Sequence, residues 1–249
     1  MAASAAVPQN NFDERTARFY DETSADLFAP AVLDPAVAFL ADLAGDGAAL
    51  EFGIGTGRVA LPLSRRGVRV HGIDISEPML ARLYEKAGAA AVTTTVGDFA
   101  TTRVEGEFRL VYLVFNTIVN LLSQEEQVAA FRNAAAHLEP GGCFVIELGV
   151  PNLRRVPPGE TRVMFDASPN HLGYDEYTDF TGQIAWSHHF WNIDGRAETW
   201  SGAWRYVWPA ELDLMALLAG MQLHERWADW TRAPFTGDSP SHISVWKKT

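Results

Sequence analysis

The sequence predicts an α/β protein with a doubly wound, mostly parallel sheet and an inserted antiparallel sheet. Apolar runs alternate with helical patterns up to about residue 150, as expected for strands covered by helices on both faces. A turn with alternating glycines at Gly53, Gly55 and Gly57 joins the first predicted strand to a helix. After Pro151 the pattern changes to short alternating runs, which are typical of antiparallel strands.

Composition and charge restrict the classes of function. A chain of 249 residues with 47% hydrophobic content can form one large domain with a full core. The formal net charge of −11 repels phosphate groups, so we expect neither nucleic acid nor a membrane surface as a partner. No apolar run approaches the roughly 20 residues that span a bilayer. The first residues lack the features of a signal peptide, and we expect a cytoplasmic protein.

Cysteine content argues against two kinds of site. Cys143 is the single cysteine of the chain, and it lies in an apolar run. An internal disulfide is therefore impossible, and a cysteine-based zinc site is improbable. We expect no metal site and interpret Cys143 as a buried strand residue.

The first part of the chain is expected to lead into the sheet. Residues 1–11 are small and polar, which predicts a disordered tail. Aromatic residues among charges over residues 12–28 predict one or two short amphipathic helices. Asp34 as N-cap and Pro35 at the first position predict a longer helix that ends near Gly45.

Strands and helices then alternate. The predicted strands cover residues 48–52 and 68–73, a segment that ends at Val96, and residues 108–115 and 143–148. The helix after the glycine turn ends at Arg66 before Gly67, and Ser123 with Glu126 forms a capping box before another helix. Pro140 to Gly142 predict a turn before the fifth strand.

The glycine turn and Asp74 both lie where a parallel sheet binds ligands. Glycines at alternate positions let the backbone turn tightly and let a ligand approach the peptide groups. Asp74 ends the second predicted strand, where a carboxylate can accept hydrogen bonds from the ribose hydroxyls of a nucleoside. The structural alternative for Asp74 is to cap the helix that follows.

Three segments together resemble the motifs of the class I S-adenosylmethionine-dependent methyltransferases. They are Glu51–Arg58 with its glycines, Gly72–Leu80 with Asp74, and Val96–Phe99 with Asp98. The resemblance implies a Rossmann-like, doubly wound seven-stranded sheet whose seventh strand is antiparallel. It also implies S-adenosyl-L-methionine as cofactor and S-adenosyl-L-homocysteine as product.

Carried onto this chain, the resemblance assigns a set of cofactor contacts. They are Tyr20, Glu51, Gly53, Gly55, Gly57, Arg58, Asp74, Ile75, Met79, Asp98, Phe99, Phe115 and Asn116. In the family an N-terminal helix with a Phe-Tyr-Asp sequence often closes over the cofactor, as Phe19 to Asp21 would here. For Tyr20 the alternative is a packing role, and for Asp98 it is a turn carboxylate.

The layout divides the chain into functional parts. Residues 12–150 would hold the N-terminal helices and the cofactor-binding core, and residues 151–208 an inserted antiparallel sheet that covers the substrate. Residues 209–249 would complete the core with a last helix and a strand pair. This layout resembles that of small-molecule methyltransferases, including the sugar N-methyltransferases of antibiotic pathways.

The inserted segment has two hairpin signals, Asp194-Gly195 and the weaker Thr181-Gly182. With two-residue turns, Tyr174 lies opposite His189, and His189 lies opposite Trp200. One face then carries Tyr174, Glu176, His189, Trp191, Trp200, Trp204 and Tyr206. A one-residue change in turn length would exchange His189 for His188 on that face.

This aromatic face predicts a cleft wall for a small molecule. His189 and Tyr174 are candidates for positioning the substrate or for accepting its proton. Asn120, His188, Trp191 and Trp200 are candidates for binding it. The alternative is that the aromatic residues only pack the sheet onto the domain.

The leading hypothesis is methyl transfer to a nitrogen or oxygen of a small molecule, and we expect a homodimer. One alternative is a non-catalytic S-adenosylmethionine-binding or regulatory protein, because a fold does not guarantee turnover. A nicotinamide-dependent oxidoreductase is a weaker alternative. Arg58 follows Gly57 and the spaced third glycine of the dinucleotide fingerprint is missing.

Overall fold

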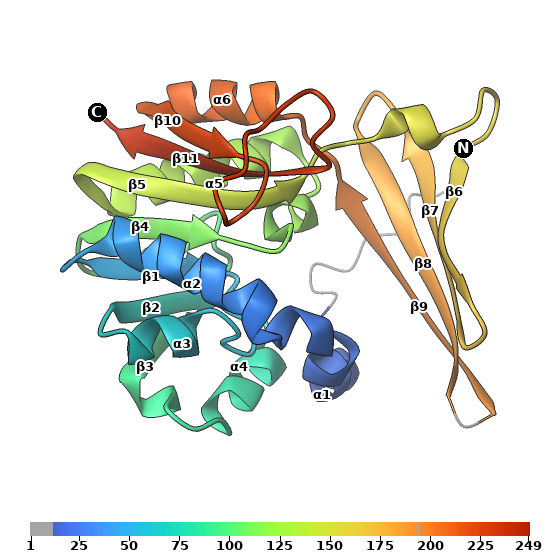
Figure 1. Ribbon diagram of the computed structural model, residues 1–249, viewed down its shortest axis with the longest axis horizontal. Coiled ribbons are helices and arrows are strands. Elements are labelled where there is room, and N and C mark those ends of the chain that lie inside the picture. The colour runs from blue at the N-terminus through green and yellow to red at the C-terminus, as the bar shows by residue number, and fades with distance from the viewer. Residues whose placement is uncertain (1–11, 194) are drawn as a thin grey trace.

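Seven strands form one sheet, and a second sheet stands beside it (Figure 1). The computed structural model describes residues 12–193 and 195–249, so the disorder expected for residues 1–11 lies outside the described residues. The strands of the first sheet are β1 (Ala48–Phe52), β2 (Arg69–Asp74), β3 (Val92–Val96), β4 (Phe108–Leu113), β5 (Leu138–Gly149), β10 (Met221–Trp227) and β11 (Ser241–Lys248). Their order is β10-β11-β5-β4-β1-β2-β3. Among these described strands β11 alone runs opposite to the other six, which confirms the predicted topology.

Helices cover both faces of this sheet. The α-helices are α1 (Glu14–Thr23), α2 (Pro30–Ala44), α3 (Ala60–Arg65), α4 (Glu77–Tyr84), α5 (Gln124–His137) and α6 (Pro209–Leu218). Short 3₁₀ helices cover Ala25–Phe28, Ala89–Ala91, Thr117–Asn120 and Leu153–Arg155. In β4, Leu110 packs with residues of α2 and α3, whereas Val111 packs with residues of α5 and α6. Burial on both faces explains why this strand is apolar except at Arg109, which is only partly buried.

Two predicted element boundaries were wrong. Helix α2 begins at Pro30 and not at Asp34, and Pro35 lies inside it. Pro30 occupies the first turn, where a missing N–H costs nothing, and the buried Val37 and Leu40 stabilise the helix beyond Pro35. Strand β5 begins at Leu138, because Leu138 already pairs with β4 and a register shift accommodates the glycines before Cys143. Cys143 is buried and free, as expected.

The second sheet is an antiparallel meander. Its strands are β6 (Arg162–Ser168), β7 (His171–Asp179), β8 (Ile184–Ile193) and β9 (Arg196–Arg205), paired in that order. In Figure 1 it stands at the right of the core, with α1 between the two at the bottom. An ion pair between Arg15 and Glu198 links α1 to β9. None of the helices in the described part of the chain is long and apolar enough to span a membrane.

The predicted register of this sheet is correct between β8 and β9 and wrong between β7 and β8. Between β8 and β9, His189 pairs with Trp200 as expected, and Ile193 pairs with Arg196 across the predicted turn, of which Asp194 lies outside the described residues. Between β7 and β8, Tyr174 pairs with His188 and not with His189. Asp179 pairs with Ile184, as a two-residue turn at Thr181-Gly182 requires. A register shift between Tyr177 and Asp179 then adds one residue to β7. Such a bulge moves the residues beyond it to the opposite face.

Arg205 at the end of β9 anchors the inserted sheet to the core. Its guanidinium donates hydrogen bonds to Gln127 of α5 at 2.5 Å, and to Gln183 and Glu211 at 2.7 Å each. The side chain is only 4% exposed. Burial alone would raise the pKa of Glu211, but its hydrogen bonds outweigh burial and hold that pKa below its ordinary value. A buried charge paired on three sides therefore fixes where the second sheet leaves the core.

Arg205→Ala is expected to lower the free energy of unfolding by about 3–5 kcal/mol, because it leaves the half-buried Glu211 carboxylate without its cation and the buried Gln127 without its donor. Denaturation by urea at neutral pH measures the change. Arg162→Ala removes the exposed partner of Glu176 and should leave stability nearly unchanged. Equal losses in the two variants would contradict the anchoring role of Arg205.

Candidate active site

The glycine turn after β1 has the backbone that only glycine adopts readily. Gly53, Gly55 and Gly57 have φ values of 69°, 54° and 78°. A Cβ on Gly53 would stand 2.6 Å from Cγ2 of Thr117, so a side chain there is also excluded by packing. The turn therefore depends on glycine for conformation and for space.

Asp74 ties this turn to the end of β2. The N–H of Gly55 donates to Oδ2 at 2.7 Å, and the N–H of Ser76 donates to Oδ1 at 2.8 Å. Ser76, and not Asp74, is the N-cap of α4, because its hydroxyl accepts from the N–H of Met79. Asp74 is 8% exposed, and burial raises the pKa of its carboxyl group against the lowering effect of these backbone bonds. Its neighbour Ile75 is 42% exposed and offers an apolar surface beside the carboxylate.

Glu51 lies beneath the turn. It is buried, and the hydroxyl of Tyr112 donates to its Oε2 at 2.9 Å. Burial raises the pKa of Glu51 to about 8, although the Tyr112 bond and the Arg58 charge oppose the shift. The guanidinium of Arg58 stands 5.3 Å from the ring centre of Phe115. Arg58 thus links the glycine turn to the loop after β4.

Helix α1 is fastened to the glycine turn by contacts that the sequence did not reveal. The hydroxyl of Thr56 donates to Asp21 at 2.6 Å, and Lys86 forms an ion pair with Asp21 at 2.5 Å. The ammonium of Lys86 also donates to the carbonyl of Thr56 at 2.8 Å. The adjacent Tyr20 is half-buried, and burial raises the pKa of its hydroxyl. The Phe-Tyr-Asp sequence pointed to this segment, but nothing in the sequence identified Lys86 as the partner.

The loop after β4 carries two residues with left-handed backbone. Phe115 and Asn116 have φ values of 54° and 58°, which are unfavourable for residues with a side chain. The side-chain Oδ1 of Asn116 accepts from the N–H of Gly149 at 2.7 Å, and the N–H of Phe115 donates to Glu147 at 2.9 Å. These bonds hold a conformation that costs of order 1–3 kcal/mol per residue. Strain of this kind is common at functional sites.

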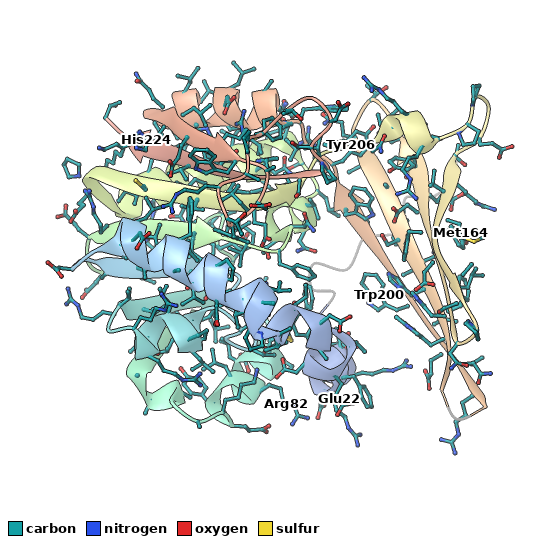
Figure 2. All side chains as sticks on the ribbon, viewed as in Figure 1. Glu22, Arg82, Met164, Trp200, Tyr206 and His224 are labelled. Atoms are coloured by element: carbon teal, nitrogen blue, oxygen red, sulfur yellow. The ribbon has the colours of Figure 1, made fainter. Side chains whose placement is uncertain are left out.

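A cavity of about 620 Å³ lies between this loop and the inserted sheet. Its lining includes Phe12, Tyr20, Phe115, Asn116, Asn120, Arg155, Phe165, Asp175, Tyr177, Ser187, His189, Trp200, Trp204 and Tyr206. Figure 2 shows Trp200 and Tyr206 on the side of the inserted sheet that faces the core, and Met164 on the far side. Gly202 makes room for Trp200, since a Cβ there would meet the indole at 2.4 Å. The cavity thus joins predicted cofactor residues to predicted substrate residues.

The bulge in β7 separates the predicted substrate residues into two groups. His189, Trp200 and Asn120 line the cavity. Tyr174 and His188 lie together on the opposite face, with ring centres 4.8 Å apart, so their expected place in the cleft was wrong. Trp191 lies beyond the lining residues and stacks on His189 at 5.0 Å. The bulge instead brings Asp175 into the cavity, which sequence reasoning missed.

The remaining cofactor candidates are held by local contacts. Asp98 accepts a hydrogen bond from the N–H of Ala100 at 2.8 Å. The side chain of Phe99 stacks in the core on Phe52, 5.7 Å away, and Met79 is buried. Asp98 and Phe99 follow the end of β3, and Met79 lies in the first turn of α4, but their contacts with a ligand stay predictions.

Comparison with known proteins identifies the family. A model described as a methyltransferase domain matches residues 49–142. The solved CcbJ methyltransferase from Streptomyces caelestis is 36% identical, with a TM-score of 0.86 over 97% of this chain and 99% of that chain. The chain belongs to the class I S-adenosylmethionine-dependent methyltransferases. The two alternative hypotheses, a nicotinamide-dependent oxidoreductase and a non-catalytic binding protein, are therefore rejected.

Two further relatives resemble this chain over most of its length. The cypemycin N-terminal methyltransferase of a Streptomyces species is 27% identical over 237 residues, which are 91% of this chain and 96% of that protein. CalS10, an amino pentose methyltransferase from Micromonospora echinaspora solved with S-adenosylmethionine bound, is 18% identical. Its TM-score is 0.69, and the match covers 92% of this chain and 97% of CalS10, so it shares the fold.

The residues of the methyltransferase fit S-adenosylmethionine as cofactor. The backbone at Gly55 is uncrowded, since a Cβ there would come no closer than 3.4 Å to its nearest neighbour, Cε of Met79. Asp74 presents a carboxylate beside the exposed Ile75, as a ribose with an adjoining adenine requires. Glu51 and Tyr20 lie near the same turn, and their contacts with the amino acid end of the cofactor stay predictions.

Asp74→Ala should weaken the binding of S-adenosylmethionine at least about tenfold, or about 1.4 kcal/mol. The substitution removes the carboxylate that we expect to bind the ribose, and it removes the acceptor that holds Gly55 in place. Isothermal titration calorimetry measures the affinity. Asp98→Ala provides the comparison for the adenine side, and unchanged affinity in Asp74→Ala would refute its role.

The pKa of Glu51, raised to about 8 in the folded protein from an ordinary value of 4.5, predicts a dependence of stability on pH. Between these values the folded state holds a proton that the unfolded state has lost, so stability falls as pH rises. Glu51→Gln removes this titration and keeps an acceptor for Tyr112. The unfolding free energy of the variant minus that of the wild type should therefore increase from about pH 5 to about pH 8. A constant difference would show that Glu51 is ionised in the fold.

Proposed function

We propose that the methyltransferase transfers a methyl group to the nitrogen of a small-molecule amine held in the cavity, by in-line displacement. The observation that carries this proposal is the cavity itself, which extends from Phe115 and Asn116 to an aromatic wall that contains one carboxylate. We also propose that the inserted sheet, residues 151–208, covers the acceptor. The expected homodimer and cytoplasmic location stay predictions.

Asp175 supports an amine as the acceptor. The hydroxyl of Ser187 donates to its Oδ1 at 2.6 Å, which leaves the second oxygen to accept from an N–H group. Burial raises the pKa of Asp175, so the carboxyl group is sensitive to a charge that enters the cavity. The faces of Trp200 and Trp204 provide apolar area and attract cations. A carboxylate among aromatic rings is a typical environment for an amino compound.

Relatives support nitrogen over oxygen. The names of three of them, the cypemycin N-terminal methyltransferase, the amino pentose methyltransferase CalS10 and the sugar N-methyltransferase KedS8, refer to amines or to nitrogen methylation. A hydroxyl acceptor stays the alternative. It would need its proton removed in or before the transition state, whereas a neutral amine already has a nucleophilic lone pair.

The chain itself contributes mainly alignment. S-adenosylmethionine supplies the electrophilic methyl group. The loop at Phe115 and Asn116, rigid because of its hydrogen bonds, would hold the acceptor side of the cavity in place. Alignment of this kind can contribute about 7–11 kcal/mol to the lowering of a barrier. Aromatic walls also exclude water from the amine, which keeps its lone pair available.

Transfer of tritium from methyl-labelled S-adenosylmethionine tests this function on a panel of small amines and their hydroxyl analogues. Label should enter amines, and Trp200→Ala and Asp175→Asn should reduce the rate by roughly tenfold or more. Cofactor affinity should stay within about twofold. Met164→Ala, on the far face of the sheet, is the matched control and should retain full activity. Transfer only to hydroxyl compounds would contradict the proposal.

A further inference from the structure

His189 is the last member of a chain of hydrogen bonds that begins outside the cavity. Asp166 of β6 lies 2.8 Å from Nδ1 of His171, measured from Oδ2. Nε2 of His171 lies 3.0 Å from Nδ1 of His189. The two imidazole rings are nearly parallel, at 15°, with centres 5.1 Å apart. Three strands thus contribute one side chain each to a single relay.

The order of donors and acceptors in this relay follows from its first member. An ionised carboxylate can only accept, so Nδ1 of His171 carries the proton that points to Asp166. In a neutral imidazole the other nitrogen is then an acceptor, and Nε2 of His171 accepts from Nδ1–H of His189. Nε2 of His189 is therefore the nitrogen with the free lone pair.

The residue that carries this lone pair lines the cavity. His189 is one of the lining residues, and its Nε2 has no hydrogen-bond partner among the described residues, yet it is not one of the fully buried polar atoms. The ring is fixed by Phe165 at 5.1 Å, by Trp191 at 5.0 Å and by Trp200 at 5.4 Å. Phe165 reaches the ring of His189 because Gly173, which pairs with His189 from β7, has no side chain. A Cβ on Gly173 would stand 2.2 Å from the ring of Phe165.

We propose that Asp166 and His171 are positioning residues that keep His189 in the Nδ1–H form, so that its Nε2 accepts the proton lost by the amine on methylation. This inference rests on the proposed function. The acceptor nitrogen forms its bond to the methyl carbon as the carbon–sulfur bond breaks and leaves its electron pair on sulfur. The nitrogen then passes its surplus proton to Nε2. The Asp166 carboxylate, which is joined to His189 through His171, favours the resulting imidazolium.

Charge and geometry agree with this role. Burial, followed by repulsion from His171 and His188, lowers the pKa of His189 to about 4, whereas Asp166 raises it. His189 is therefore neutral at neutral pH, and the lone pair of its Nε2 is free. Among the described residues no group of three or more His, Cys, Asp or Glu side chains is arranged to hold a metal ion. Asp175 on β7 is a diagonal neighbour of His189, roughly 7–8 Å away between Cα atoms for such pairs, so one amine can reach both.

The tautomer of His189 can be measured without any substrate. Ring ¹⁵N chemical shifts distinguish Nδ1–H from Nε2–H, and the signals of His189 are assigned by their loss in His189→Phe. The wild type should show mainly Nδ1–H. His171→Phe, which keeps an aromatic ring, and Asp166→Ala, at a more exposed position, should both increase the Nε2–H form. Ser201→Ala, which removes the partner of His188 on the far face, should not.

Kinetics then connect the tautomer to turnover. In His171→Phe, kcat for an amine should fall roughly tenfold or more, with KM and cofactor affinity nearly unchanged. A wild type that is mainly Nε2–H, or variants with an unchanged tautomer, would overturn the proposed relay. If no amine is methylated but the tautomer shifts as expected, the proposed function has failed and the relay remains. Normal kcat with a shifted tautomer would refute the proton transfer.

Discussion

Two backbone N–H groups converge on the carboxylate of Asp74, and the ligand-binding edge of the core depends on that junction. Gly55 belongs to the turn after β1 and Ser76 to the start of α4, so the side chain joins two neighbouring strand ends. Burial disfavours the charge, and the two hydrogen bonds offset this cost. An amide could accept through only one of its two terminal atoms. The need for two acceptors therefore explains a carboxylate here, apart from any contact with ribose.

The acceptor side depends on a different constraint. The inserted sheet is anchored at its base by the buried Arg205 and touches α1 near its far end through Arg15 and Glu198. Between these two contacts the sheet stands off from the core, and the cavity occupies the space. Arg205 and Glu211 are six residues apart, but Gln127 is remote in sequence. The polar network thus connects the insertion to helices that belong to the core.

The parallel part of the fold could be predicted because several local signals agree there. Apolar runs, the glycine turn, Asp74 and the capping box at Ser123 all indicate the same order of elements, and the structure confirms it. The start of α2 could not be predicted, because packing of Val37 and Leu40 outweighs the boundary signal of Pro35. The relay of Asp166, His171 and His189 was equally hidden. It joins three strands whose register is decided only when the sheet forms.

The bulge in β7 lies at Thr178, between Tyr177 and Asp179. It shows why the acceptor side of the site can change in sequence more easily than the cofactor side. Side chains alternate between the faces of a strand, so one added residue decides whether Tyr174 or Asp175 faces the acceptor. Without the bulge, Tyr174 and Glu176 would stand beside His189, and the carboxylate would reach the cavity from another position. The cofactor side has no comparable freedom, since it depends on glycine conformations and on two hydrogen bonds to Asp74. Insertions or deletions in the second sheet can therefore alter acceptor recognition and leave cofactor binding intact.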